Sequence, residues 1–251
     1  MKILVIGETC RDRFVYGNAT RLCPEAPVPV FVEENIISAI GMAGNVKRNI
    51  LACADDLGKQ VSVDIITNHK SGFKTRYIDS VSNQMFLRVD SDTYHSLDTD
   101  KLLDIDFDNY DAVIVSDYNK GFLSCQDLIY IARKAKLSFL DTKRKYKSIW
   151  ADLFDFVKIN EKEYRENGFE ENYDLCRSNT IVTLGSKGCM FKDDIFKPER
   201  SCQVRDVSGA GDTFIAAFAL YYLMTGEVDL SIAYAQRCCS IVIGKAGTAT
   251  I

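Results

Sequence analysis

The segment DVSGAGDT, residues 206–213, places an acid beside a run of very small residues. Residues 208–211 are Ser, Gly, Ala and Gly, so backbone N–H groups there can approach an anion closely. A long apolar stretch follows and predicts a helix, whose dipole adds partial positive charge at the same point. Asp212 would lie in the first turn of that helix, where its carboxylate could accept a proton from a hydroxyl that attacks a phosphate. The residues alone also allow a second interpretation, in which Asp212 is only a favourable acid at a helix start.

A second glycine cluster, GMAGNVKRN at residues 41–49, begins another predicted helix. The small residues Gly41, Ala43 and Gly44 would let a polyhydroxylated ligand lie close to the backbone. Asn45 could both donate hydrogen bonds to the hydroxyls of such a ligand and accept them. On these residues alone, the cluster is equally a packing corner.

Polar residues follow each of five short apolar runs. Because open parallel sheets bind ligands beyond the carboxyl ends of their strands, these residues should converge on one crevice. For any single residue a solvated loop position is the simpler explanation, but five such groups together favour a ligand site. The groups are Gly7, Glu8 and Asp12; Asp117; Asp141 and Lys143; Asn160 and Glu163; and Thr183, Ser186 and Lys187.

The apolar runs themselves are rich in β-branched residues and lie far enough apart to leave room for helices, such as one over residues 125–136. This pattern indicates βαβ units and predicts an α/β fold with a mostly parallel central sheet. The runs are ILVIG from Ile3, AVIVSDY from Ala112, LSFLDTK from Leu137, FVKIN from Phe156 and TIVTLG from Thr180.

The last fifty residues predict two helices. The stretch over residues 213–226 is apolar on nearly every face, so we expect a central, buried helix that ends at Gly226. The stretch over residues 231–247 predicts a second helix beside it, closed by Gly244 or Gly247.

Two segments show a different pattern. Residues 28–34 and 75–90 alternate apolar and polar side chains, with turn-forming residues at 80–83. Alternation means that one face is wet or is covered only by a ligand or partner, so these segments predict a small antiparallel β flap outside the main sheet. We expect it to act as a lid. No linker or repeat divides the chain, which predicts one domain over residues 1–251 with lid segments at about 13–40 and 74–90.

The composition suits a globular protein with one chemical task. The 251 residues are 47% hydrophobic and 26% charged, and the net charge of −4 argues against nucleic acid or an anionic membrane as the partner. A small molecule is the better expectation. The nine cysteines are scattered and there are only two His, so zinc sites and disulfides are not predicted. No apolar run approaches the roughly 20 residues that cross a bilayer, and we expect a cytoplasmic protein.

Two of these motifs resemble those of a known family. DVSGAGDTF is similar to the signature of the ribokinase-like, or PfkB-type, carbohydrate kinases, and GMAGNV is similar to the N-terminal glycine signature of the same family. Other segments resemble the kinase domain of the subfamily of bifunctional heptose-7-phosphate kinases and heptose-1-phosphate adenylyltransferases, and together they span almost the whole chain. CPEAPVPV from Cys23 and GKAGTAT from Gly244 are the more specific of them. The segments are GETCRDRFVYGNATRLCPEAPVPVF, KTRYIDSVSNQMFLRVD, VSDYNKGFL and IVIGKAGTATI.

This resemblance implies a three-layer ribokinase-like fold and a reaction. ATP, with Mg²⁺, would phosphorylate the anomeric hydroxyl of D-glycero-D-manno-heptose 7-phosphate to the 1,7-bisphosphate, a step toward lipopolysaccharide sugars. Asp212 would be the general base, and the backbone of Gly209, Ala210 and Gly211 would stabilise the transferred phosphoryl group. Closure of the lid would exclude water, and a homodimer formed through the lid is expected.

The resemblance also implies binding residues. Asn160 and Glu163 match the family's NxxE element and would place magnesium, through water, against the ATP phosphates. The remaining nucleotide contacts would be Thr183, Gly185, Lys187, Gly188 and Ser208. The sugar contacts would be Asp12, Gly41, Asn45, Arg88 and Asp117. Lys120 would bind the substrate's own phosphate, and Lys47 or Arg48 are the alternative residues for that role.

The chain departs from the family pattern at several points. Met42 replaces the second of two paired glycines and Gly44 replaces an Ala, which affects the sugar side of the site. Thr142 stands where Pro is usual, and the stretch between Leu57 and Lys74 is short enough to lack a strand and a helix. No adenylyltransferase domain follows, so a separate protein is expected for the next step. Two alternatives stay open: a kinase for another sugar or sugar phosphate, and a decayed binding protein of the same fold.

Overall fold

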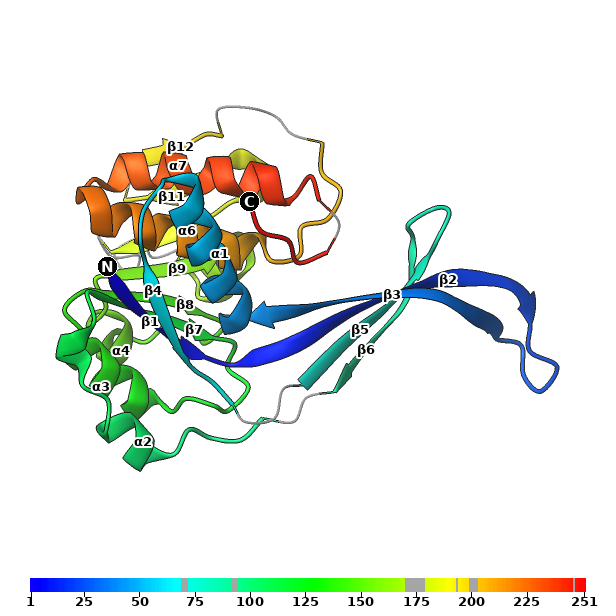
Figure 1. Cartoon of the computed structure of the whole chain (residues 1–251), viewed down its shortest axis with the longest axis horizontal. Helices are drawn as coiled ribbons and strands as arrows, with labels where there is room; N and C mark the ends of the chain where they lie inside the picture. Colours follow the sequence, from blue (N-terminus) through cyan, green and yellow to red (C-terminus); the bar gives the residue numbers. More distant parts are fainter. Residues whose placement is uncertain (69–71, 92–93, 170–178, 193, 199–202, 246) are drawn as a thin grey trace.

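The computed structural model describes residues 1–68, 72–91, 94–169, 179–192, 194–198, 203–245 and 247–251. It has a main sheet of eight strands and a second sheet of four strands, which extends away from the main body as a long arm (Figure 1). The main strands are β1 (Lys2–Gly7), β4 (Ser62–Ile66), β7 (Ala112–Asp117), β8 (Ser138–Thr142), β9 (Phe156–Asn160), β10 (Thr180–Thr183), β11 (Cys189–Phe191) and β12 (Asp194–Phe196).

The main sheet has the order β12-β11-β10-β9-β8-β7-β1-β4. The neighbouring strands β10, β9, β8, β7, β1 and β4 all run parallel. At the other edge of the sheet, β11 and β12 pair antiparallel. All five apolar runs of the sequence form strands of this sheet, which confirms the α/β class with a mostly parallel sheet.

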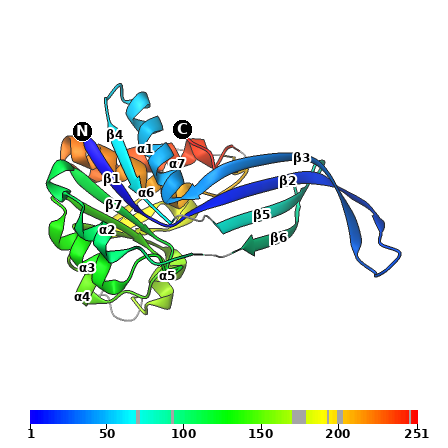
Figure 2. The same ribbon diagram turned by 60° about the horizontal axis from the view of Figure 1, so that its bottom comes forward.

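Helices cover both faces of the main sheet (Figure 2). Side chains alternate between the two faces along each strand: Ile3 and Val5 pack with the helices α1, α6 and α7, whereas Leu4 and Ile6 pack on the side of α2, α3 and α4. The chain therefore has three layers with two apolar clusters. The helices are α1 (Ala43–Asp56), α2 (Thr99–Leu103), α3 (Cys125–Lys134), α4 (Ser148–Ala151), α5 (Glu161–Glu166), α6 (Ala210–Thr225) and α7 (Val228–Val242), with short 3₁₀ turns at Phe107–Asn109 and Gly185–Lys187.

Helix α6 is the central buried helix that the sequence predicts. Its residues Phe214 to Leu220 are all buried, and it ends at Gly226, whose φ of 72° is the left-handed conformation that favours glycine at this position. The prediction for α7 was wrong in its limits. That helix begins at Val228 and ends at Val242, and its C-cap is Ile243 rather than Gly244 or Gly247.

The second sheet has the order β3-β2-β5-β6 and is the predicted flap. Its two outer pairs are antiparallel, but the central pair of β2 and β5 runs parallel, because β5 returns to the arm only after α1 and β4. The arm is also longer than expected, since β2 and β3 reach back to Thr9 and forward to Met42, directly beside β1 and α1. Its strands are β2 (Thr9–Leu22), β3 (Pro29–Met42), β5 (Gly72–Asp79) and β6 (Met85–Ser91).

Three smaller predictions concern the described residues. The seven cysteines among them are free thiols, while Cys176 and Cys202 lie outside the described residues. No helix in the described part of the chain is both long and apolar enough to cross a membrane. Between Leu57 and Lys74, the described stretch holds only β4 and the start of β5, so α1 leads to the arm through a single edge strand.

Candidate active site

A pocket of about 460 Å³ lies where the carboxyl ends of β8, β9 and β10 meet the start of α6. Residues from three of the five predicted strand-end groups, those after β8, β9 and β10, line it together with the glycine turn, whereas Gly7, Glu8, Asp12 and Asp117 are not among its lining residues. The lining residues are Tyr118, Asp141, Lys143, Lys158, Asn160, Glu161, Lys162, Thr183, Gly185, Val207, Gly209, Gly211 and Asp212.

Asp212 lies in the first turn of α6 and is 3% exposed. Its Oδ1 accepts a hydrogen bond from the Tyr118 hydroxyl at 2.9 Å, and its Oδ2 accepts one from Asn45 Nδ2 at 3.1 Å. Burial raises the pKa of this carboxyl to about 6, and the negative charge of Asp141 acts in the same direction, while the two hydrogen bonds oppose them. A base with a pKa near the operating pH is well matched to proton transfer.

The glycine turn before α6 is shaped for a close backbone approach. Gly209, the N-cap of α6, has a φ of 82°, which is strained for any residue with a side chain. A Cβ at Gly209 would come within 2.7 Å of Asn45 Nδ2, and one at Gly211 would come within 2.8 Å of Lys158 Nζ. No described side chain caps α6. The Ala210 N–H donates to the Val207 carbonyl at 3.2 Å, while Gly209 and Gly211 line the pocket. The sequence-based prediction of an anion cradle fits this geometry.

Two ion pairs flank the turn. Lys158 Nζ lies 3.0 Å from Asp141 Oδ2, and Lys143 Nζ lies 2.6 Å from Glu163 Oε1. The other oxygen of Asp141, Oδ1, is buried and accepts no hydrogen bond from the described residues. The pocket therefore holds two cations beside the glycine turn and one carboxylate oxygen that lacks a donor.

Asn160 and Glu163 close the start of α5 as a capping box. Asn160 Oδ1 accepts from the Glu163 backbone N–H at 2.9 Å, and Glu163 Oε2 accepts from the Asn160 backbone N–H at 2.8 Å. Among the described residues, no group of three or more His, Cys, Asp or Glu could hold a metal ion directly. The Oδ1 of Asp141 is the acceptor here that lacks a donor among the described residues, and a hydrated magnesium ion, which usually keeps several waters, needs only one or two carboxylates. Both oxygens of Glu163 already accept from Lys143 and Asn160. The role of Asn160 and Glu163 through water stays a prediction.

The other predicted nucleotide residues divide into two groups. Thr183 and Gly185 line the pocket at the end of β10. Ser208 precedes the turn, and its backbone N–H donates to Asp206 Oδ1 at 2.8 Å. Lys187 is exposed and paired with Glu161 at 3.0 Å, and Gly188 has a φ of 98° next to the Phe196 carbonyl; neither is among the residues that line the pocket.

Three predicted sugar residues lie near the base of the arm. Asp12 and Gly41 are neighbours across β2 and β3, and a Cβ at Gly41 would come within 2.2 Å of Asp12 Oδ2. Asn45 joins this group to the pocket through its bond to Asp212. Asp12 is 3% exposed and forms an ion pair with Arg76 at 2.7 Å.

The structure does not bring the remaining sugar residues into this group. Arg88 lies farther along the arm and pairs with Asp90 at 2.7 Å, and Lys120 is exposed in the loop after β7. Asp117 is fully buried, and its carboxylate accepts from Arg144 Nε and from the Thr142 hydroxyl at 2.6 and 2.7 Å. These contacts give Asp117 a role in holding the ends of β7 and β8 together.

Met42 lies where the family pattern has glycine, and it has a φ of 59° at the start of α1. A left-handed conformation is costly for a residue with a long side chain, which explains why glycine is expected there. The Met42 side chain is nevertheless buried and 3.8 Å from the Tyr94 hydroxyl.

Sequence reasoning did not single out Tyr118, Lys158 or Arg76 as site residues. For Lys158 a signal existed, because a lysine inside the apolar run FVKIN has to be buried in a parallel sheet. Tyr118 and Arg76 lie in segments that the motifs cover, but only the packing shows which carboxylates they contact.

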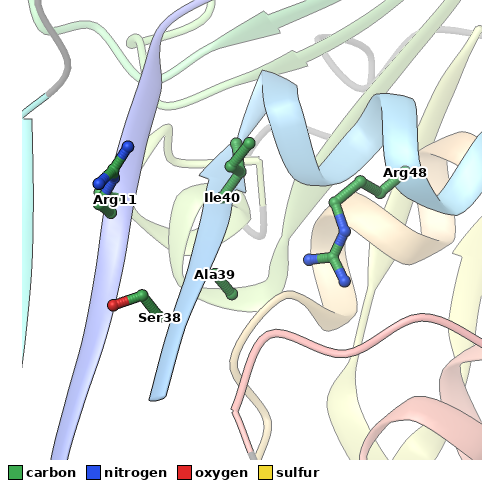
Figure 3. A pocket seen from close by; sticks show the side chains of 5 residues that line it. All are labelled: Arg11, Ser38, Ala39, Ile40 and Arg48. Atoms are coloured by element: carbon green, nitrogen blue, oxygen red, sulfur yellow. The ribbon is translucent and has the colours of Figure 1, made fainter. Parts of the chain in front are cut away.

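A second pocket, of about 340 Å³, lies outside this site, at the base of the arm (Figure 3). It is lined by Arg11, Ser38, Ala39, Ile40 and Arg48. Arg48 is one of the alternative residues predicted to bind the substrate's phosphate. It lines this second pocket, and its Nη1 donates to the Thr248 carbonyl at 3.5 Å.

Comparisons with known proteins agree on one family and one fold. The family described as pfkB family carbohydrate kinase matches residues 39–251. The bifunctional protein HldE of Sulfurimonas denitrificans is 29% identical over 302 aligned residues, with 100% of this chain and 62% of that protein covered. HldE of Helicobacter acinonychis is 31% identical over 300 residues, with 99% and 64% covered. The chain thus spans less than two thirds of these relatives' length, and the alignments are longer than the chain, in keeping with its shortened middle.

Solved structures show the same fold at low identity. The ribokinase of Thermotoga maritima matches with a TM-score of 0.72 and 15% identity, over 98% of this chain and 94% of that one. The ribokinase of Arabidopsis thaliana, complexed with ribose and ATP, matches with a TM-score of 0.69 and 18% identity, over 98% and 93%. Phosphofructokinase-2 of Escherichia coli matches with a TM-score of 0.71 and 14% identity, over 98% and 94%.

Proposed function

Because the chain belongs to the pfkB family of carbohydrate kinases, we propose that it transfers the γ-phosphoryl group of ATP to the anomeric hydroxyl of heptose 7-phosphate. The observation that carries this proposal is the buried carboxylate of Asp212, with a pKa of about 6, beside a glycine turn that offers backbone donors to an anion. The Asp212 carboxylate can deprotonate an alcohol, and the glycine turn can bind the phosphoryl group.

Asp212 acts as the general base in this proposal. Each of its oxygens accepts one hydrogen bond from the protein, and a carboxylate oxygen has a second lone pair that can accept the sugar hydroxyl. Tyr118 and Asn45 fix the direction of the carboxylate, which limits the motion that the reaction requires. Burial raises the pKa of the Tyr118 hydroxyl well above its usual range, and the charge of Asp212 adds to the effect, so this phenol stays protonated and remains a donor.

The ATP phosphates would lie against the first turn of α6. The backbone N–H groups of Gly209 and Gly211, which line the pocket, would stabilise the negative charge that grows during transfer, and the helix dipole would add to their effect. Ala210 would need to release the Val207 carbonyl to contribute. Asn160 and Glu163 would place a hydrated Mg²⁺ through water, with the unpaired Oδ1 of Asp141 as a further acceptor, and the ion would neutralise phosphate charge when bound. Thr183 and Gly185 place the nucleotide at the end of β10.

The sugar would bind between the pocket and the base of the arm. Asp12, Gly41 and Asn45 lie on this side of Asp212, and the Arg76 ion pair holds the Asp12 carboxylate in place. The choice of heptose 7-phosphate is supported by the segments that resemble the heptose kinase subfamily and by the matches to HldE over nearly the whole chain. Lys120 remains the predicted ligand of the substrate's phosphate.

The arm would serve as a lid that meets a second copy of the chain. It exposes many large apolar side chains, more than an isolated surface usually leaves in water. A homodimer would cover them and fix the lid over the sugar. The exposed apolar residues of the arm include Val32, Ile36, Ile37, Ile40, Phe73, Met85, Phe86, Leu87 and Val89. The cytoplasmic location and the separate adenylyltransferase stay predictions.

An ADP-release assay with magnesium ATP tests the proposal. The acceptors are heptose 7-phosphate, fructose 6-phosphate, ribose and free heptose, with Asp212→Asn as the inactive control. We expect release with heptose 7-phosphate above every other acceptor. Release with another acceptor only would change the substrate, and release with none would favour the binding protein over the enzyme.

A further inference from the structure

Lys158 is a buried lysine inside the central sheet. Its side chain is 2% exposed and its partner Asp141 is 4% exposed, yet both line the pocket beside the glycine turn. A buried ion pair is weak evidence for stability, because well-packed apolar residues in its place are often as stable or more so. The pair therefore calls for another explanation.

The position of the ammonium group supplies one. A Cβ at Gly211 would lie 2.8 Å from Lys158 Nζ and 3.9 Å from Asp141 Oδ2, so the cation sits directly against the first turn of α6. The start of a helix carries partial positive charge, which repels a cation and attracts an anion. Asp141 neutralises the ammonium group from one side, and an anion bound at the helix start would be attracted both by this group and by the helix.

The unused hydrogen-bonding capacity points the same way. An ammonium group has three donors, and among the described residues the one acceptor it contacts is Asp141 Oδ2. The second oxygen of Asp141 has no donor among them and is buried. That oxygen can take only a donor or a cation, whereas the two remaining donors of Lys158 can bind an anionic ligand.

We propose that Lys158 is a catalytic residue whose ammonium group contacts the transferred phosphoryl group, with Asp141 holding it in place. This inference rests on the proposed phosphoryl transfer. A cation fixed by the sheet strengthens interaction with the phosphoryl oxygens as charge grows on them, and it needs no reorganisation during the step. The three donors of the group can serve Asp141 and the phosphoryl oxygens together.

Lys158→Met tests the inference with two readouts. The first is kcat in the ADP-release assay, which we expect to fall about 100- to 1,000-fold, the usual loss for one donor of this kind. The second is the affinity for ADP and for the non-hydrolysable β,γ-imido analogue of ATP, measured by calorimetry without sugar. The preference for the analogue over ADP should fall about tenfold or more, since only the analogue carries a γ-phosphoryl group. The exposed Lys59, changed to Met, is the control and should leave both readouts unaltered.

The two readouts separate this inference from the proposed function. An active wild-type protein whose Lys158→Met variant keeps both kcat and the analogue preference overturns the role of Lys158 and leaves the kinase in place. A wild-type protein that phosphorylates no acceptor, but loses its analogue preference in the variant, removes the proposed function and supports the contact. If methionine leaves Asp141 without a partner and the variant fails to fold, Lys158→Gln keeps a donor for Asp141 without the charge, and the same two results decide.

Discussion

The replacement of Asp212 by Asn gives two effects of opposite sign. It removes the proposed general base, so turnover should fall about 100- to 10,000-fold, the usual contribution of a base. It also removes a buried charge, so the protein should become more stable at neutral pH. The hydrogen bonds can survive, since the Asn oxygen can accept from Asn45 while its amide donates to the Tyr118 hydroxyl, which can also accept.

The size of the stability gain follows from the pKa. Burial raises the pKa of Asp212 from 3.8 to about 6, which corresponds to about 3 kcal/mol against the ionised carboxylate in the folded state. This figure is an upper limit for the stability gain of Asp212→Asn, because the Asn side chain does not reproduce every contact of the Asp side chain. The folded protein binds the extra proton between the two pKa values, so wild-type stability falls as the pH rises from about 4 to 6 and the penalty is complete above that. The advantage of Asp212→Asn should therefore be largest at pH 7 to 8 and should vanish near pH 4.

Urea unfolding of both proteins at pH 4.5, 6 and 8, together with the ADP-release assay, measures both effects. Affinity for ADP should stay nearly unchanged, because the nucleotide binds through the glycine turn. Unchanged turnover in Asp212→Asn would refute the role of the base. A stability difference that does not depend on pH would refute the raised pKa.

Three further predictions concern neighbouring residues. Tyr118→Phe removes a hydrogen bond that lowers the pKa of the catalytic carboxylate, so the acidic limb of the pH profile of kcat/KM should move to higher pH; a limb that stays in place would show that the phenol does not tune the base. Gly211→Ala should lower kcat at least about tenfold, by displacing the Lys158 ammonium group from its buried pair with Asp141, and Tm should fall, because disturbing a buried ion pair costs more than the roughly 1 kcal/mol that Ala gains over Gly in a helix; equal kcat would mean that the close approach is not needed. Arg144→Met leaves the fully buried Asp117 charged and without its cation, which should cost about 3–5 kcal/mol in urea unfolding, and a loss below about 1 kcal/mol would contradict the importance of this pair.

The local motifs were readable in the sequence because their chemistry depends on residues that are adjacent in the chain. The turn at residues 208–211, the acid at Asp212 and the buried helix after them all come from one continuous segment. The strands were predictable for a similar reason, since β-branched apolar runs of five or six residues form buried parallel strands. The limits of α7 were not predictable, because its C-cap residue Ile243 accepts hydrogen bonds from the backbone of Arg205 and Asp206, in the loop before α6.

Contacts between segments that are far apart in the chain could not be predicted from the sequence. Lys158 and Asp141 are 17 residues apart, and Asn45 and Asp212 are 167 residues apart, so no spacing rule connects them. Asp117 is a similar case. Its place at the end of a strand suggested a ligand, and only the packing shows that Arg144, from the loop after the next strand, pairs with its carboxylate. The parallel pairing of β2 with β5 likewise follows from the path of the chain through α1 and β4.

The sequence by itself determined the family, the α/β class and the position of Asp212 beside the glycine turn at the start of a buried helix, because short-range sterics and hydrophobic periodicity act within a segment. The tertiary structure alone decided which charges face one another at that site, and thus the pKa of Asp212 and the burial of the Lys158 ammonium group. Electrostatic energies depend on distance and on exclusion of water, and both are set only when segments far apart in the chain pack together.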